Sequence, residues 1–345
     1  GAHKGKSLRL EHEDAPNVWT GTLFLNQVNS DNLPDVGDKV LVVGGGDTAI
    51  DAARVSKRLG ADVTVVYRRT RNEMPAIEEE IVGAEEEGIN FYFLAAPNEL
   101  IVDNSSGNVM KMKCEKMELG EPDDSGRRRP VPTGEFFELD CSTVIPAISQ
   151  EPDFDNLENL HEGKDWVKAD DSFKTPLEKT FAGGDALDLG LVTIAIFQGR
   201  KAAETMHNNF RGIEPEPEEE RPVVTQDQIV YSYYTEKARH EALKIPPDER
   251  LKSLEKEISC TLTAEEVNDE ALRCMSCGSC FDCGTCWSLC QDQVFVKPPT
   301  KQFKPYKMKL DLCKGCMKCA ENCPCGFIEM QDPATGEYAK LERAE

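Results

Sequence analysis

Cysteines are concentrated towards the C-terminal end of the sequence at regular spacing. Of the 14 cysteines, 11 lie between positions 274 and 325. The stretch CMSCGSCFDCGTCWSLC, residues 274–290, repeats three-residue steps and lengthens only the last step to four. Thiolates at such steps bind zinc ions or iron–sulfur clusters. Disulfide frameworks belong to small secreted scaffolds, which do not usually carry a long α/β region in front. The spacing therefore predicts thiolate ligation of metal in a reducing cytoplasm.

Two copies of one motif set the frame of ligation. CFDCGTCWSLC and CKGCMKCAENCP both follow C-x2-C-x2-C-x3-C, the motif of bacterial ferredoxins, in which the fourth cysteine of each run ligates the other cluster. A zinc ribbon has no use for the third cysteine and the x3 step. The motif thus predicts two [4Fe–4S] clusters. The first would be held by Cys280, Cys283, Cys286 and Cys323, and the second by Cys313, Cys316, Cys319 and Cys290.

Several features around these runs remain open. A third metal site is one interpretation of the cysteines left over, and thiols packed beside the clusters are the other. Gln291 stands where the motif prefers proline, and the segment between the runs is expected to form hairpin strands. The glycines at 278, 284 and 315 would let amides approach the cluster sulfurs. The cysteines left over are Cys260, Cys274, Cys277 and Cys325.

A nucleotide-binding unit lies far upstream, in KVLVVGGGDTAIDAARVSKRLGADVTVVYRR. The β-branched run 39–43 predicts a buried parallel strand, and Gly44, Gly46 and Ala49 fit G-x-G-x-x-A in a βαβ context. Asp47 is expected to cap the helix whose N-terminus faces the phosphates. The residues predicted to contact the nucleotide here are Gly44, Gly45, Gly46, Asp47 and Thr48.

The end of the second strand selects the nucleotide. NAD sites usually present an acidic residue about 20 residues after the glycines, whereas this chain has Arg68 and Arg69, with Arg71 just beyond. Guanidinium groups suit a 2′-phosphate. The sequence therefore favours NADP(H) over NAD(H), the alternative being a solvated basic turn.

A second nucleotide motif occurs in TFAGGDALDLGLVTIAIFQGRKAAETM. It resembles the second flavin-contacting motif of the two-dinucleotide-binding-domain flavoproteins. The resemblance implies FAD contacts at Gly184 and Asp185, and at Leu191 and Val192 where the next helix begins; a helix N-terminus favours negative charge on a reduced flavin. No G-x-G-x-x-G strand precedes residue 39, so we expect a longer polypeptide or another chain to complete the FAD site.

These motifs give a fold class and five segments. We expect an α/β, Rossmann-like two-dinucleotide-binding-domain flavoprotein with a parallel sheet, followed by a ferredoxin-like α+β 2[4Fe–4S] module. The net charge of −23 argues against nucleic acid, and no apolar run approaches the roughly 20 residues of a membrane span. The first three segments are a partial FAD-domain crossover at 1–36, an NAD(P)H-binding domain at 37–150 and the C-terminal part of the FAD domain at 151–211. An acidic linker and helical segment follows at 212–270 and begins with the proline- and glutamate-rich tract at 212–222. The ferredoxin domain is expected at 271–345.

From residue 1 to about 210 the chain resembles the small subunit of glutamate synthase and its relatives, through GGGDTAIDAAR, YRRTRNEMPA, VIPAISQEPD and FAGGDA. Ser149 stands where relatives often have glycine. With its cysteine module, the chain resembles iron–sulfur flavoproteins of anaerobes, including the partner of dissimilatory sulfite reductase. Thioredoxin-reductase-like enzymes carry a redox CxxC in the nucleotide domain, but this chain has only Cys114 between Asp62 and Asp140, so disulfide exchange is not expected; Cys114 and Cys141 are interpreted as buried small hydrophobes.

The resemblance implies a relay from NAD(P)H to FAD and through two clusters to a protein acceptor, or the reverse flow. That acceptor or donor would be a ferredoxin, a sulfite reductase or a synthase-type large subunit. The first alternative is an electron-input subunit of a glutamate synthase-like or 2-oxoacid:ferredoxin oxidoreductase complex. The second is a non-catalytic electron-transfer subunit.

Overall fold

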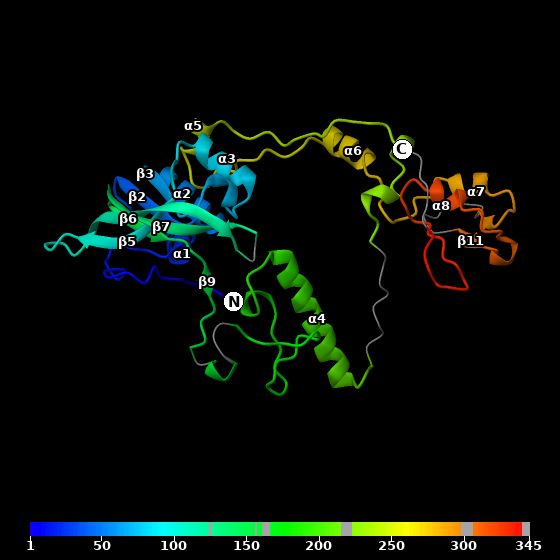
Figure 1. Cartoon of the computed structure of the whole chain (residues 1–345), viewed down its shortest axis with the longest axis horizontal. Coiled ribbons are helices and arrows are strands. Elements are labelled where there is room, and N and C mark those ends of the chain that lie inside the picture. Colours follow the sequence, from blue (N-terminus) through cyan, green and yellow to red (C-terminus); the bar gives the residue numbers. More distant parts are fainter. Residues whose placement is uncertain (124–125, 156, 161–165, 215–222, 298–305, 340–345) are drawn as a thin grey trace. The chain divides into compact units, whose positions relative to one another are not determined.

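The chain folds into two compact units in its computed structural model (Figure 1). The first unit contains residues 1–215 and 245–258, and the second contains residues 216–244 and 259–345. The structure describes residues 1–123, 126–155, 157–160, 166–214, 223–297 and 306–339. The proline- and glutamate-rich tract expected to be a linker falls largely outside these residues.

A parallel sheet forms the centre of the first unit. Its strand order is β4 (Asn90–Phe93), β3 (Asp62–Tyr67), β2 (Lys39–Val43) and β8 (Thr143–Pro146), with every neighbouring pair parallel. Valine dominates β2 and β3, whose side chains are buried on both faces of the sheet, as a covered parallel sheet requires. The sequence prediction of the strand–turn–helix–strand unit at residues 39–67 is therefore confirmed.

The two faces of this sheet are covered differently. On one face lie α1 (Gly21–Asn29), α2 (Asp47–Arg58) and α3 (Glu78–Glu86), which bury Phe24, Ile50 and Ile81 against β2 and β3. The other face packs on an antiparallel sheet of β5 (Ala95–Val102), β6 (Val109–Pro122) and β7 (Arg128–Asp140). Figure 1 shows this second sheet beside β2 and β3.

Cys114 and Cys141 lie between the two sheets. Both thiols are buried in the core that includes Leu100 and Met112. Burial raises the pKa of each thiol to about 12, so both remain protonated at neutral pH. Their interpretation as small core hydrophobes is confirmed.

The rest of the first unit begins where β8 ends. A short strand β9 (Gln150–Glu151) pairs with β1 (Lys4–Gly5). The 3₁₀ turns η2 (Glu158–Leu160) and η3 (Gly184–Ala186) precede the 20-residue helix α4 (Val192–Arg211), which ends at the left-handed Gly212.

The segment 225–270 is less helical than expected from its charged composition. It contains 3₁₀ turns η4 (Gln226–Gln228) and η5 (Tyr231–Tyr233) and only two short helices, α5 (Pro247–Arg250) and α6 (Ala264–Leu272). Pro247 begins α5, because the first turn of a helix needs no amide donor there.

Residues 245–258 pack with the first unit rather than forming a spacer. Arg250 is only 4% exposed, and its guanidinium donates to Glu86 of α3 at 2.8 Å and to the carbonyl of Ile245 at 2.7 Å. Glu87, which Arg54 and Arg58 also bind, lies 3.9 Å from the same guanidinium. This buried charge cluster holds the segment against α3.

The second unit carries the cysteine runs on short elements. Helix α7 (Thr285–Leu289) and helix α8 (Lys318–Glu321) each begin inside one run, and the antiparallel pair β10 (Phe295–Val296) and β11 (Lys307–Met308) lies between them. The 3₁₀ turn η6 (Leu310–Leu312) precedes Cys313. The expected hairpin strands between the runs are confirmed. Among the helices of the described residues, none is both long and apolar enough to cross a membrane.

Candidate nucleotide and iron–sulfur sites

A cavity of about 640 Å³ opens beyond the carboxyl ends of β2, β3 and β8. Ligands of open α/β sheets bind at this edge of the sheet. The volume lies in the range of small-molecule and cofactor sites. All seven residues predicted to contact the pyridine nucleotide line this cavity: Gly44, Gly45, Gly46, Asp47, Thr48, Arg68 and Arg69.

The three glycines after β2 differ in what surrounds them. Gly44 has φ +147°, and a Cβ there would lie 2.3 Å from the carbonyl oxygen of Ala147. A Cβ on Gly45 would meet the ring of Tyr67 at 2.5 Å. A Cβ on Gly46 would meet only Pro75 within 4 Å, at 3.9 Å, so this position borders open space in the cavity. Gly44 and Gly45 therefore serve packing, and Gly46 leaves room for a ligand.

The predicted cap of α2 by Asp47 is wrong. The N-cap residue is Gly46, and Asp47 is the first residue of the helix. The Asp47 carboxylate instead accepts a hydrogen bond from the amide of Ile77 at 2.9 Å. Its place in the first turn still suits the helix dipole, but its contact holds the loop before α3. Sequence spacing did not reveal this contact because its partner lies 30 residues away.

The two arginines after β3 have different surroundings. Arg68 is exposed at the cavity, whereas Arg69 is 6% exposed and donates from Nη2 to Asp123 at 2.9 Å and from Nε to the carbonyl of Arg128 at 2.7 Å. Arg127, which the sequence reasoning missed, also lines the cavity. In the sequence, Arg127 belongs to the basic run 127–129, which lies far from the glycine motif. Only the folded chain brings Arg127 to the same cavity as the glycines. Arg71 pairs with Glu78 and Glu85.

Near the nicotinamide end expected for this fold, Ser149 adopts φ +128° and lines the same cavity. A positive φ is uncommon for a residue with a side chain, which accounts for the glycine expected at this position. Gln150 donates to the hydroxyl of Thr48 at 3.3 Å. Leu189 lines the cavity from the segment before α4.

The residues expected to contact FAD flank the start of α4. Gly184 and Asp185 form η3, and the Gly184 amide donates to Gln198 at 2.6 Å. Leu191 and Val192, at the helix start, are 69% and 72% exposed. No side chain caps this helix end, so its amides and its positive dipole end face outward. This arrangement fits the predicted contact with a flavin.

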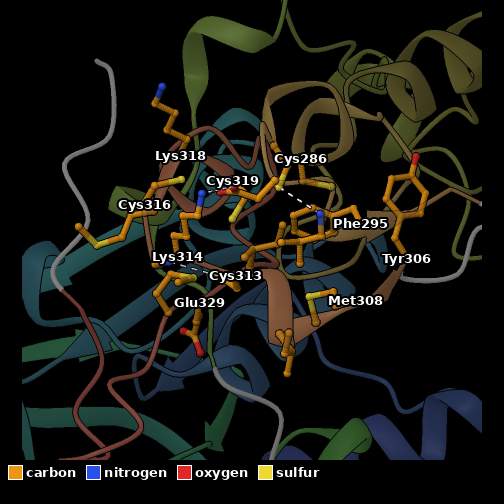
Figure 2. Close-up of a pocket in the computed structure, with 18 of the residues that line it drawn as sticks. Cys286, Phe295, Tyr306, Met308, Cys313, Lys314, Cys316, Lys318, Cys319 and Glu329 are labelled. Atoms are coloured by element: carbon orange, nitrogen blue, oxygen red, sulfur yellow. Dashed lines mark hydrogen bonds and ion pairs between the residues drawn. The ribbon is translucent and has the colours of Figure 1, made fainter.

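One cavity in the second unit collects the second predicted set of cysteines. It measures about 790 Å³ and is lined by Cys290 from the first run and by Cys313, Cys316 and Cys319 from the second run, with apolar walls that include Phe295. Figure 2 shows Cys313, Cys316 and Cys319 together with Phe295 and Met308 around this space. The structure thus brings together the four residues of the crossed assignment.

A smaller cavity collects the first predicted set. It is lined by Cys280, Cys283 and Cys286 from the first run and by Cys323 from the second run. Cys325 also lines it, and Cys280 and Cys286 border the larger cavity as well. The cysteines of this cavity come from both runs, as the ferredoxin motif C-x2-C-x2-C-x3-C predicts.

The two cysteine runs share a backbone conformation in addition to their sequence motif. In the first run Asp282 and Gly284 have positive φ, and in the second run Gly315 and Met317 do so at the equivalent steps. Adopting this conformation twice without glycine is costly, which indicates that the loop shape is required. Ser276 and Gly278 repeat it in CMSCGSC, so Cys274 and Cys277 stand on a loop of the same form. Cys260, Cys274 and Cys277 are exposed.

Backbone amides reach the sulfurs. Val294 donates to Cys290 and Gly315 donates to Cys313, both at 3.4 Å. Such N–H···S contacts stabilise thiolates and tune iron–sulfur clusters. Burial raises the pKa of Cys286 to about 12, so this thiol ionises at neutral pH only with a positive charge beside it.

A pair of sulfurs lies at the smaller cavity. Cys323 and Cys325 are 3.9 Å apart and both buried, and the hydrogen bond between the two sulfurs lowers the pKa of Cys323. In the described part of the chain, no three His, Cys, Asp or Glu side chains could hold a single metal ion.

Comparison with protein families identifies the family to which the first unit is similar. The family model described as pyridine nucleotide-disulphide oxidoreductase matches residues 2–199. The chain belongs to this family. Membership confirms the two-dinucleotide-binding-domain α/β fold class and the class of oxidoreductase predicted from the sequence, one that depends on a pyridine nucleotide.

Three relatives show how far the similarity extends. The chain is 38% identical over 267 residues to NADPH-Fe(3+) oxidoreductase subunit beta of Geobacter sulfurreducens, covering 68% of this chain and 38% of that protein. It is 44% identical over 199 residues to NADP(+)-dependent formate dehydrogenase subunit beta of Moorella thermoacetica, covering 55% and 28%.

The glutamate synthase (NADPH) small chain of Escherichia coli K12 is 37% identical over 226 residues, covering 58% of this chain and 47% of the relative. This similarity confirms the resemblance to the glutamate synthase small subunit. The chain spans less than half the length of each of these three relatives. The resemblance to the partner of dissimilatory sulfite reductase stays a prediction.

Proposed function

We propose that the chain is the nucleotide-binding and electron-outlet portion of an NADP(H)-dependent iron–sulfur flavoprotein oxidoreductase that exchanges single electrons with a protein partner. When bound, FAD and the two [4Fe–4S] clusters supply the redox chemistry, which converts a hydride into single electrons. The residues of the chain bind, orient and shield; none of them needs to act as an acid or base.

The observation that carries the proposal is the grouping of eight cysteines around two cavities. The second predicted set lines the larger cavity and the first set lines the smaller one, while Cys280 and Cys286 border both. A fourth ligand from the other run is the arrangement of ferredoxins with two clusters. The first cluster would be held by Cys280, Cys283, Cys286 and Cys323. The second would be held by Cys313, Cys316, Cys319 and Cys290.

The residues of the first unit support binding of NADP(H). Gly46 leaves the cavity open at the N-terminus of α2, where backbone amides favour the pyrophosphate. Arg68 is exposed in the same cavity, where its guanidinium suits a 2′-phosphate. The names of the three relatives also contain NADPH or NADP(+). NADP(H) is therefore preferred to NAD(H) in this proposal.

The residues around the start of α4 would contribute to the FAD site. Asp185 would take a flavin ribityl hydroxyl, and the outward N-terminus of α4 at Leu191 and Val192 would favour negative charge on the reduced ring. Relatives named as subunits or chains of larger enzymes favour a protein partner. A ferredoxin, a sulfite reductase or a synthase-type large subunit would each fit as acceptor or donor.

Anaerobic purification of the complete native protein tests the proposal. Flavin, iron and sulfide are measured, and reduction of a viologen dye is followed with NADPH and with NADH. We expect FAD, about eight irons per chain, four for each cluster, and faster dye reduction with NADPH. A colourless preparation that contains zinc, or one that lacks flavin and does not oxidise NADPH, would contradict it.

A further inference from the structure

The two predicted cluster sites differ in how far the chain covers them. In the first set Cys323 is buried and only Cys283 is exposed, whereas in the second set Cys313 and Cys316 are both exposed. The second set also borders the larger cavity, of about 790 Å³. A cluster held by the second set would therefore lie closer to the surface of its unit than one held by the first set.

The segment 223–234 contributes to the cover of the first site. The amide of Val230 donates to the carbonyl of Pro324 at 3.2 Å, and Pro324 lines the smaller cavity. The hydroxyl of Tyr234 donates to the carbonyl of Met275 at 2.9 Å, within the stretch that leads into the first cysteine run. This segment therefore packs against the wall of the first site.

Lysines gather around the second site. Between residues 306 and 318 the chain has four lysines and a single acidic residue, Asp311, although the whole chain carries a net charge of −23. All four lysines are exposed, and two of them line the larger cavity beside the cysteines, as Figure 2 shows for Lys314 and Lys318. The four are Lys307, Lys309, Lys314 and Lys318. This part of the surface is thus positive on an otherwise acidic chain.

Apolar side chains are exposed among these lysines. Met308, Leu310 and Leu312 are 54%, 67% and 41% exposed. Exposed apolar side chains next to charged ones mark surfaces that bind other proteins. The four lysines together with these three residues are called the lysine face.

The acidic groups that line the larger cavity have partners in the structure. Asp292 pairs with Lys314 at 2.8 Å, and Glu329 accepts a hydrogen bond from Gln228 at 3.4 Å. The other three lysines of the face form no ion pair with another described residue. Their charges are therefore available to a molecule that approaches the second site.

We propose that the lysine face is the docking site of a small, acidic one-electron carrier protein, and that the second cluster site, rather than the first, serves exchange with this carrier. The inference rests on the proposed function, because it requires both clusters. One electron passes to the oxidised carrier in each encounter, and NADPH is the source of the electrons. Since electron transfer slows steeply with distance, the less covered site is the better outlet. The lysine face attracts an acidic carrier, and the negative charge of the rest of the chain repels it, so the carrier is oriented at the second site.

Binding of two haem proteins to the complete protein, prepared without oxygen and measured by calorimetry, tests the face. Cytochrome b5 is the acidic probe and cytochrome c is the basic one. We expect the double variant Lys309→Glu, Lys318→Glu to weaken cytochrome b5 at least about tenfold at low salt, and the difference to shrink at high salt, where charges are screened. Cytochrome c should bind this variant no more weakly than the wild type.

The double variant Lys237→Glu, Lys244→Glu is the matched control. It makes the same change of charge at two exposed lysines of the second unit that line neither cysteine cavity, and it should weaken cytochrome b5 far less. Carbodiimide crosslinking followed by mass spectrometry locates the contact. Cytochrome b5 should be joined to Lys309 or Lys318 in higher yield than to Lys237 or Lys244. Equal weakening of cytochrome b5 by the two double variants, or equal weakening of both haem proteins by the first, would overturn the inference.

The outcomes also separate this inference from the proposed function. A complete protein that lacks the clusters, or whose clusters NADPH does not reduce, contradicts the proposed function itself. If the clusters are present and reduced but cytochrome b5 ignores the charge of the lysine face, only the docking site is overturned. Slower reduction of the clusters by NADPH in the variant Lys309→Glu, Lys318→Glu would assign the face to contact with the nucleotide-binding unit of the same chain, and would overturn the inference as well.

Discussion

The glycines after β2 have different roles: Gly46 leaves room for a ligand, whereas Gly45 allows close packing. A methyl group at Gly46 would meet only Pro75 at 3.9 Å, whereas one at Gly45 would overlap the ring of Tyr67. We expect Gly46→Ala to fold normally and to weaken NADPH at least tenfold, because the methyl group occupies the approach of the pyrophosphate. Gly45→Ala should unfold at lower denaturant concentration. Chemical denaturation and calorimetry check both, and a Gly46→Ala chain with unchanged affinity would contradict the assignment.

Ser149 carries backbone strain beside the same cavity. Its φ of +128° belongs to a region that costs a residue with a side chain on the order of 1–3 kcal/mol. Ser149→Gly should therefore raise the free energy of unfolding by about 1 kcal/mol. Ser149→Ala is the matched control, because it removes the hydroxyl but keeps the Cβ, and it should bring no gain. A destabilised Ser149→Gly chain would show that the serine hydroxyl matters more than the strain.

At the scale of elements, the two cysteine runs act as one unit. Cys319 belongs to the second run and lines the larger cavity with Cys290 of the first run. We expect Cys319→Ser to lower the iron content of anaerobically prepared protein to about half, because one of two clusters of four irons loses a ligand. Cys260→Ser, at an exposed cysteine outside both runs, should keep the full iron content. Equal loss in both variants would contradict the ligand assignment.

The buried side chain of Arg250 contacts α3 from the segment 245–258. Removing Arg250 breaks its contact with Glu86 and its weaker contact with Glu87, although Glu87 keeps Arg54 and Arg58. We expect Arg250→Ala to expose residues 245–258 to limited proteolysis and to cost about 2 kcal/mol. Lys252→Ala breaks an exposed pair with Glu249 and should cost little. Equal protection of the segment in both variants would contradict its anchoring by Arg250.

The sequence was informative where a pattern is local. The glycine turn after β2 and the frame of each cysteine run follow from spacing over a few residues. The role of Asp47 and the surroundings of Arg69 did not follow, because their partners lie 30 or more residues away. These partners are Ile77 for Asp47, and Asp123 and Arg128 for Arg69. The anchoring of 245–258 was missed for the same reason, since a charged composition does not reveal which charge is buried.

At the scale of the molecule, the chain combines a nucleotide cavity in one unit with two cysteine cavities in the other. The chain passes from one unit to the other at three points, between 215 and 216, between 244 and 245, and between 258 and 259. In the proposed function, one unit would take the two-electron donor and the other would hold the one-electron carriers, so the division into units would follow the division of the proposed chemistry.

The central claim is that interleaved cysteines hold two clusters that are reduced at the expense of a pyridine nucleotide. Mössbauer spectroscopy of the complete protein, grown with ⁵⁷Fe and prepared without oxygen, tests it most directly. We predict that nearly all the iron, about eight atoms per chain, has the parameters of [4Fe–4S] clusters, and that NADPH converts part of it to the reduced form. Iron in mononuclear sites, or clusters whose spectrum NADPH leaves unchanged, would contradict the claim.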